Sequence, residues 1–312
     1  MEATHIGMGT VMAHAAYGPN AQAALQAVTH EARRLEQLLS RFVPDSDVAA
    51  INRTAGMARQ TVSTETLAVL TQAQALSALC GGAFDITVAP LVDLWDVQHA
   101  TAPPAAARIR RAAALVDYRD LTLCQNTFEA MLRRPGQALD LGGIGKGYAS
   151  DAFMRLLMSM GITSAYANLG GNVSTLGARP DGAPWRVGIR HPRGDGLLCA
   201  VEMIGQAVVT SGDYERFFID RRGKRYHHIL DPRAGRPAAK GLISATVVAP
   251  EAMAADALST ALLASGMEAG LDWFSQYGAA QAILIDERLN LYCSKGLGGC
   301  LQTVAGVKPI LI

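Results

Sequence analysis

The sequence contains no apolar stretch of the ~20 residues that a membrane-spanning helix needs. Its first residues form neither a basic start nor an apolar signal segment, and they include no lipid-attachment cysteine. As written, the chain is therefore expected to be soluble and cytoplasmic. The 28 Lys and Arg residues nearly balance the 27 Asp and Glu residues, which leaves no large basic field to bind a nucleic-acid backbone.

The five cysteines are widely spaced and form no CxxC pair, which argues against structural zinc and dithiol chemistry. What is present is the composition of a folded enzyme, because half of the 312 residues are hydrophobic and 18% are charged. We expect one elaborated domain over residues 1–312, with a flexible surface loop at the Ala/Pro-rich residues 100–107.

Apolar periodicity predicts four helices separated by short strands. The helices begin at Asn20, at Ser63 or Thr64, near Lys146 and near Ala252. The apolar stripe of the first helix consists of Leu25, Val28, Ala32, Leu35 and Leu39. Strands are expected at residues 4–17, 164–168, 184–190, 198–204, 207–211, 215–220, 242–249, 280–285 and 289–293. Several strands are joined too closely for helical crossovers, so we predict an α+β fold with helices packed on largely antiparallel sheets.

A glycine-rich loop, DLGGIGKG at residues 140–147, leads directly into the third predicted helix. Glycines let backbone groups approach a ligand, a helix N-terminus favours anions, and Lys146 adds a positive charge. The loop therefore suits a diphosphate. It matches neither the GxxxxGK[ST] nor the GxGxxG nucleotide-binding pattern, and a plain strand-to-helix turn explains it equally well.

Asp256 and Thr260 are one turn apart on the fourth predicted helix. This spacing puts a carboxylate and a hydroxyl on the same face, where both oxygens can reach one hard cation such as Mg²⁺. By itself the pair is weak evidence, since an exposed aspartate beside a threonine that bonds back to a carbonyl is the commoner arrangement.

His228 precedes an Asp-Pro turn in the run YHHILDP. Because the pKa of histidine lies near neutrality, His228 is suited to accept a proton from an incoming hydroxyl. A histidine at a strand edge, with Asp231 capping the turn, is the simpler interpretation. The run GGAFDITVAPLVDLW at residues 81–95 also sets an aromatic ring and a carboxylate after a helix, which suits stacking on a planar ligand.

Seven motifs, taken together and in order, resemble the FAD:protein FMN transferases of the ApbE family. They read MGT, FDITVAPLVDLW, ALDLGGIGKGYASD, ANLGGN, VVTSGDYERFF, YHHILDPRAGRP and ADALSTALLASG, and they extend from Met8 to about Gly266. The resemblance implies a T-fold-like α+β architecture with the FAD site between two lobes. One departure is visible, because the family usually reads LWG whereas Trp95 is followed here by Asp96.

The resemblance also implies roles for individual residues. Asp256, Thr260 and the carbonyl of Gly143 match the metal ligands of the family, and His228 matches its proposed catalytic base. The positions that match contacts of the flavin nucleotide are Met8, Phe42, Ala83, Phe84, Asp85, Asp140, Lys146, Ile229 and Leu230.

The implied reaction is magnesium-dependent transfer of FMN from FAD to a threonine or serine hydroxyl of an acceptor flavoprotein, with release of AMP. Acceptors of the family carry the threonine in a short flavinylation motif, and many family members are exported lipoproteins. Two alternatives stay open on the sequence alone. One is an FAD pyrophosphatase, in which water replaces the acceptor hydroxyl, and the other is a non-catalytic FAD-binding protein.

Overall fold

The computed structural model describes residues 1–312, and its central element is a nine-stranded sheet. The strands follow the order β1-β2-β6-β7-β10-β15-β16-β17-β19 across the sheet. Neighbouring strands are antiparallel except β17 and β19, which are parallel. Their bounds are Glu2–Gly7 (β1), Thr10–Tyr17 (β2), Ser164–Leu169 (β6), Asn172–Leu176 (β7), Ala207–Gly212 (β10), Leu242–Ala249 (β15), Gln281–Asp286 (β16), Leu291–Cys293 (β17) and Ile310–Leu311 (β19).

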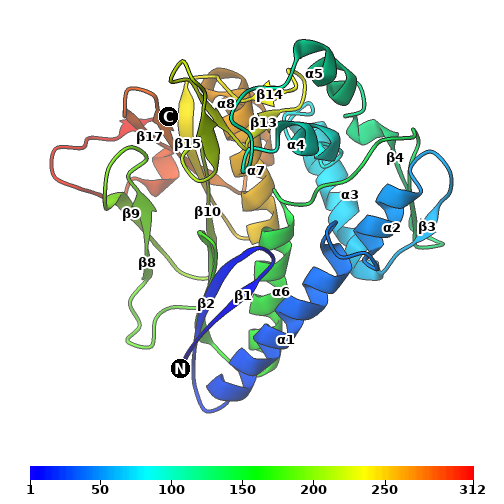
Figure 1. Ribbon diagram of the computed structural model, residues 1–312. Coiled ribbons are helices and arrows are strands. Elements are labelled where there is room, and N and C mark those ends of the chain that lie inside the picture. Colours follow the sequence, from blue (N-terminus) through cyan, green and yellow to red (C-terminus); the bar gives the residue numbers. More distant parts are fainter.

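Helices α1, α6 and α7 cover one face of this sheet, and α6 lies between α1 and α7 (Figure 1). The principal hydrophobic core forms between the helices and the sheet, and it includes every residue of the apolar stripe predicted on the first helix. The helices are Ala21–Leu39 (α1), Asp47–Arg53 (α2), Thr64–Leu79 (α3), Ala89–Trp95 (α4), Ala106–Ala113 (α5), Gly145–Ser159 (α6), Ala252–Ser265 (α7) and Met267–Tyr277 (α8).

A three-stranded sheet, in the order β18-β9-β8, packs on the opposite face of the large sheet. Ile189 and Val201 of the small sheet meet Val208, Val248 and Ile285 of the large sheet in a second core. The bounds of the small sheet are Trp185–Arg190 (β8), Leu197–Met203 (β9) and Leu301–Thr303 (β18), and a 3₁₀ turn at Lys295–Leu297 (η2) precedes β18.

The remaining elements lie beside the helices and frame the site. Helices α4 and α5 and two short hairpins, β11-β12 and β13-β14, enclose a third core made of Leu91, Trp95, Ile109, Phe218 and Leu230. The bounds in this region are Gln60–Thr61 (β3), Tyr118–Asp120 (η1), Leu121–Cys124 (β4), Glu129–Leu132 (β5), Phe217–Ile219 (β11), Arg225–His227 (β12), Leu230–Asp231 (β13) and Arg236–Pro237 (β14).

The structure confirms the α+β fold with largely antiparallel sheets. The single strand expected at residues 4–17 is wrong, because Met8 and Gly9 both have positive φ (48° and 71°) and turn the chain into a hairpin. The segment 100–107 is irregular up to Ala105 and then enters α5, and its flexibility stays a prediction. None of the helices has the length and hydropathy needed to cross a bilayer.

Two neighbouring histidines of the β1–β2 hairpin differ in burial, because His14 is buried and His5 is half-buried. The ring centroids of His5 and His14 are 5.1 Å apart, and the ring of Phe153 on α6 meets His14 edge-on at 5.5 Å. His14 is 1% exposed, and no ring nitrogen of either histidine has a hydrogen-bond partner. Burial, with a smaller repulsion from His5, lowers the pKa of His14 to about 4. The core therefore holds an imidazole that is uncharged at neutral pH.

We expect His14→Leu to reduce the acid sensitivity of the fold. The pKa of His14 falls from 6.5 to about 4 on folding, so the unfolded chain binds the proton first. The contribution of neutral His14 to the free energy of unfolding is therefore complete above pH 6.5 and is lost as the pH falls toward 4. Urea titrations across this range should show about 3 kcal/mol less acid destabilisation in the variant. His30→Ala, at an exposed position of α1, should behave as the wild type, and full acid loss in His14→Leu would contradict the assignment.

Candidate functional site

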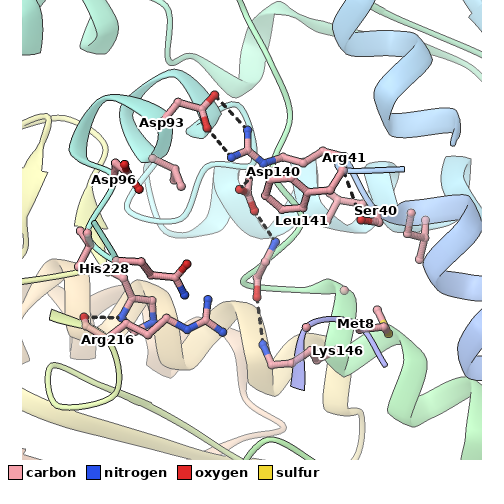
Figure 2. Close-up of a pocket in the computed structure, with 18 of the residues that line it drawn as sticks. Met8, Ser40, Arg41, Asp93, Asp96, Asp140, Leu141, Lys146, Arg216 and His228 are labelled. Atoms are coloured by element: carbon pink, nitrogen blue, oxygen red, sulfur yellow. Dashed lines mark hydrogen bonds and ion pairs between the residues drawn. The ribbon is translucent and has the colours of Figure 1, made fainter. Parts of the chain in front are cut away.

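The glycine-rich loop runs from Asp140 into the first turn of α6 and is folded tightly on itself. Asp140 Oδ1 accepts a hydrogen bond from Gly142 N (2.7 Å), and Lys146 Nζ donates to the Gly142 carbonyl (3.0 Å) (Figure 2). The ammonium group of Lys146 therefore lies over the loop, near the positive end of the helix.

Asp256 faces this loop from α7. Its side chain is buried, and Oδ2 accepts a hydrogen bond from Gly147 N (3.0 Å) and lies 3.8 Å from Lys146 Nζ. A Cβ at Gly147 would clash with the backbone of Ala252 and Met253, so only glycine allows α6 and α7 to approach this closely. The carboxylate is thereby held at the start of α6.

Thr260 lies one turn further along α7 and faces the same loop. Its Oγ1 lies 3.2 Å from Ser211 Oγ, and a Cβ built on Gly143 would lie 3.3 Å from Thr260 Oγ1. The structure thus places Thr260 beside Gly143 and Asp256 beside Gly147 of the same loop, and their role as metal ligands stays a prediction. Carboxylate, hydroxyl and carbonyl oxygens are hard ligands of the kind that Mg²⁺ accepts. Protein sites for Mg²⁺ usually supply only one or two carboxylates, and phosphate oxygens of the substrate complete the coordination shell. No group of three or more His, Cys, Asp and Glu side chains is arranged to hold a metal ion.

A cavity of about 850 Å³ lies beside the loop, within the size range of small-molecule sites. Its walls come from the tip of the β1–β2 hairpin, the end of α1, α4, the glycine-rich loop and the segment that joins β12 to β13 (Figure 2). The predicted site residues that line it are Met8, Phe42, Asp140, Lys146, His228 and Leu230.

Phe42 stands at the edge of this cavity and is 80% exposed. The guanidinium of Arg41 lies over its ring, with 4.7 Å between the carbon of the guanidinium and the ring centroid. An aromatic face of this kind is available to stack on a planar ligand.

Arg41 is a cavity residue that the sequence did not indicate. Its Nη2 lies 2.5 Å from Asp93 Oδ1 on α4, and its Nε lies 2.9 Å from Asp140 Oδ2 (Figure 2). One guanidinium therefore joins α4 to the glycine-rich loop and offsets two carboxylates. The negative charge of Asp140 is paired with Arg41, and Arg41 is paired in return. Lys146 is therefore the cation of the loop that could pair with an anion.

His228 lies across the cavity from Arg41, between β12 and β13. The carbonyl of Arg216 accepts a hydrogen bond from His228 N (3.0 Å) and lies 3.3 Å from His228 Nδ1. A carbonyl only accepts, so Nδ1 carries the proton and Nε2 keeps a free lone pair. Burial, reinforced by Arg216 and more weakly by Lys146, lowers the pKa of His228 to about 4. The imidazole is therefore neutral at pH 7 and is able to accept a proton.

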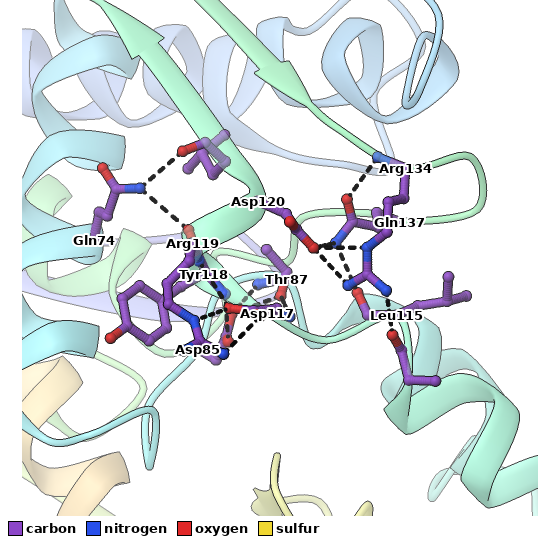
Figure 3. A network of polar contacts seen from close by, with 12 residues as sticks. Gln74, Asp85, Thr87, Leu115, Asp117, Tyr118, Arg119, Asp120, Arg134 and Gln137 are labelled. Carbon is purple, nitrogen blue, oxygen red and sulfur yellow. Dashed lines mark hydrogen bonds and ion pairs between the residues drawn. The ribbon is translucent and has the colours of Figure 1, made fainter.

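The loop Ala83-Phe84-Asp85 lies behind the cavity and does not line it. Phe84 reaches the glycine-rich loop, because its Cε2 would lie 3.2 Å from a Cβ on Gly143. Asp85 accepts hydrogen bonds from Thr87 N (2.8 Å), Thr87 Oγ1 (2.7 Å) and Tyr118 N (2.8 Å) (Figure 3). The bond from Tyr118 ties the loop to η1, the two from Thr87 hold the loop itself, and burial raises the pKa of the Asp85 carboxyl. In this conformation the carboxylate fixes the loop.

Ile229 also lies outside the cavity lining, although Leu230 beside it is part of the wall. The carbonyl of Ile229 accepts a hydrogen bond from Ala238 N (2.9 Å), and the Ile229 side chain is buried in the principal core. The hydrogen bond and the buried side chain of Ile229 therefore anchor the segment that carries His228.

Comparison with known proteins identifies the family. The sequence matches the model of the ApbE family over residues 8–284. The chain belongs to the ApbE family. It is 37% identical over 265 residues to an FAD:protein FMN transferase of Klebsiella pneumoniae, covering 84% of this chain and 82% of that protein. It is 34% identical to an FAD:protein FMN transferase of Treponema pallidum, covering 88% of this chain and 80% of that protein.

Solved structures of ApbE proteins share the fold. The ApbE protein of Thermotoga maritima superposes with a TM-score of 0.86 at 31% identity, covering 95% of this chain and 97% of that chain. The flavin transferase ApbE of Vibrio cholerae superposes with a TM-score of 0.85 at 27% identity, covering 96% of this chain and 98% of that chain.

The departure from the usual ApbE sequence at Asp96 has a local explanation. Asp96 ends α4 in the left-handed conformation (φ 36°, ψ 53°), which glycine adopts freely and aspartate tolerates. Its amide still donates to the Val92 carbonyl (3.0 Å), and its carboxylate pairs with His99 Nδ1 (2.8 Å). The backbone conformation is thus one that the glycine would also adopt, and the substitution adds a carboxylate to the cavity wall.

We expect Gly147→Ala to separate α6 from α7 and to lower stability by about 1–3 kcal/mol, the usual effect of overpacking. Its added methyl would overlap the backbone of Ala252 and Met253. Gly145→Ala is the matched control in the same helical turn, since its methyl would meet only Leu141 and Met8 at 3.7 and 3.8 Å. Urea unfolding followed by circular dichroism measures both, and equal losses would show that the α6–α7 contact is not the cause.

Proposed function

We propose that this ApbE-family chain transfers FMN from FAD to a hydroxyl side chain of an acceptor protein, with magnesium bound and with AMP as the leaving group. One observation carries the proposal: the oxygens of Asp256 and Thr260 meet the glycine-rich loop beside a cavity that also contains a neutral histidine. The names of the relatives in Klebsiella pneumoniae and Treponema pallidum support the transfer of FMN from FAD to a protein.

In this proposal Asp256, Thr260 and the carbonyl of Gly143 would hold Mg²⁺. When bound, the ion would polarise the pyrophosphate and offset the charge that develops during transfer. Lys146, whose Nζ lies 3.8 Å from Asp256 Oδ2, binds the same diphosphate as a point charge near a helix N-terminus. Phe42, with Met8 and Leu230, provides the apolar surface for the flavin part of FAD.

His228 acts as the general base in this proposal. Its Nε2 removes the proton from a threonine or serine hydroxyl of the acceptor, and the hydroxyl oxygen attacks the FMN phosphorus. A new oxygen–phosphorus bond forms as the bond from that phosphorus to the bridging oxygen breaks, and AMP leaves with the bridging oxygen. The Arg216 carbonyl keeps the proton on Nδ1 throughout and so keeps Nε2 available.

We expect Thr260→Val to raise the magnesium concentration that gives half-maximal transfer by at least about tenfold, with the maximal rate partly restored at saturating magnesium. Valine has the shape of threonine without the hydroxyl, so the packing around Gly143 is kept. Asp256→Ala should have a larger effect because it also leaves Gly147 N without its acceptor. Unchanged magnesium dependence in both variants would remove these residues from the ligand set.

We expect His228→Ala to bind FAD almost normally but to transfer FMN ~10²–10⁴-fold more slowly, the usual range for a general base. Because the pKa of His228 is about 4, the base is already unprotonated at neutral pH. The wild-type kcat/KM should therefore rise with pH through about 4, and His228 should impose no further pH dependence near neutrality. Equal loss of FAD affinity and rate would indicate a structural role, and His30→Ala is the control.

The deciding experiment is mass spectrometry of a candidate acceptor domain after incubation with this protein, FAD and magnesium. Transfer predicts an acceptor that is heavier by one FMN, together with free AMP. Free FMN with an unmodified acceptor would instead support an FAD pyrophosphatase. Tight FAD binding without AMP release would support a binding protein.

A further inference from the structure

Asp151 lies on α6 outside the cavity, yet its carboxylate reaches the start of α7. Oδ1 accepts a hydrogen bond from Ala252 N (2.7 Å), and Oδ2 accepts one from Met253 N (2.9 Å). These donors belong to the first two residues of α7. A carboxylate that receives two amide hydrogen bonds at the positive end of a helix is a charge-assisted contact, stronger than a neutral hydrogen bond.

Helix α7 has no capping side chain of its own. Its N-cap residue is Glu251, which makes no side-chain hydrogen bond to the helix, and its first turn contains no acidic residue. Asp151 therefore supplies from α6 the acceptor that an N-cap side chain normally supplies locally. Burial raises the pKa of Asp151 to about 6, although the two amide donors lower it, so the group is a carboxylate at neutral pH.

The relation between the two helices is reciprocal. Helix α6 also lacks a side-chain cap at Ile144, and Asp256 of α7 accepts a hydrogen bond from Gly147 N instead. Gly147 and Asp151 are one turn apart on α6, as are Ala252 and Asp256 on α7, so all four lie where the helices face each other. Each helix thus has its N-terminus bound by a carboxylate of the other.

We propose that Asp151 is a positioning residue for the metal site, and that it sets the place of Asp256 and Thr260 relative to the glycine-rich loop. The inference deepens the proposed function and rests on it. The space between Thr260 and Gly143 has little slack, since a Cβ on Gly143 would already lie 3.3 Å from Thr260 Oγ1. Because both ligands are on one rigid helix, a shift of the start of α7 moves them together.

The test is Asp151→Ala in the full chain, with Glu251→Gln as the matched control. The control removes a negative charge from the same helix end without removing a hydrogen bond. Binding of Mn²⁺ alone is followed by the electron paramagnetic resonance signal of the free ion, and FMN transfer gives the magnesium concentration for half-maximal rate. We expect Asp151→Ala to weaken Mn²⁺ binding ~10- to 100-fold, as when groups that orient metal ligands are removed. The magnesium concentration for half-maximal transfer should rise by the same ~10- to 100-fold. Saturating magnesium should restore most of kcat, and Glu251→Gln should match the wild type.

A second substitution separates position from stability. Glu251 already has the extended backbone of an N-cap (φ −113°, ψ 128°), so Glu251→Ser gives α7 its own capping hydroxyl. Added to Asp151→Ala, Glu251→Ser should restore the urea midpoint but not the affinity for Mn²⁺. Recovery of both the urea midpoint and the Mn²⁺ affinity would overturn the inference, because Asp151 would then act only as a helix cap.

A milder variant keeps the test decisive if Asp151→Ala does not fold. Asp151→Asn retains one acceptor oxygen and turns an amide donor toward the other N–H, so an intermediate loss of Mn²⁺ affinity is expected. Wild-type Mn²⁺ affinity in folded Asp151→Asn and Asp151→Ala would overturn the positioning role, as would a wild type that binds no Mn²⁺. A wild type that binds Mn²⁺ with this dependence on Asp151 but transfers no FMN would contradict the proposed function alone.

Discussion

Where α6 crosses α7, Gly147 lies against the backbone of Ala252 and Met253 so closely that no side chain has room. The two helix starts are hydrogen-bonded across this contact, Asp151 to α7 and Asp256 to α6. The two helices position the predicted site residues close together, since α6 follows the glycine-rich loop and α7 carries the predicted metal ligands. The distance from the glycine-rich loop to Asp256 and Thr260 is therefore set by backbone contact, which is less deformable than contact through long side chains.

Charge is arranged around this contact so that few ionised groups are unpaired. Arg41 engages Asp93 and Asp140 on one wall of the cavity, while Lys146 lies near Asp256 at its base. On the other wall, burial and nearby cations keep His228 neutral. A bound diphosphate would offset part of the positive field and so raise the pKa of the base toward the working pH. In the proposed reaction, the bound anion would thus also adjust the pKa of His228.

Local patterns predicted four of the eight helices, α1, α3, α6 and α7, because each has apolar spacing or end signals within one or two turns. The other four, α2, α4, α5 and α8, were not predicted. The same local rule predicted that Asp256 and Thr260 share a helix face. Contacts between residues distant in sequence have no such signal, and the ion pair of Arg41 with Asp140 is one of them. The hairpin at Met8 was missed for a different reason, since methionine is an unusual residue at positive φ and the sequence there reads as one continuous strand.

Two parts of the cavity wall are formed by residues with a strained backbone. Met8, Asp96, Phe128 and Leu289 are the non-glycine residues with positive φ, and all but Asp96 lie in turns between paired strands. Only Met8 and Asp96 line the cavity. The strand ladder holds Met8, and the hydrogen bond to the Val92 carbonyl holds Asp96, so the surrounding structure compensates for the strain. The shape of these two parts of the wall is consequently fixed by the backbone.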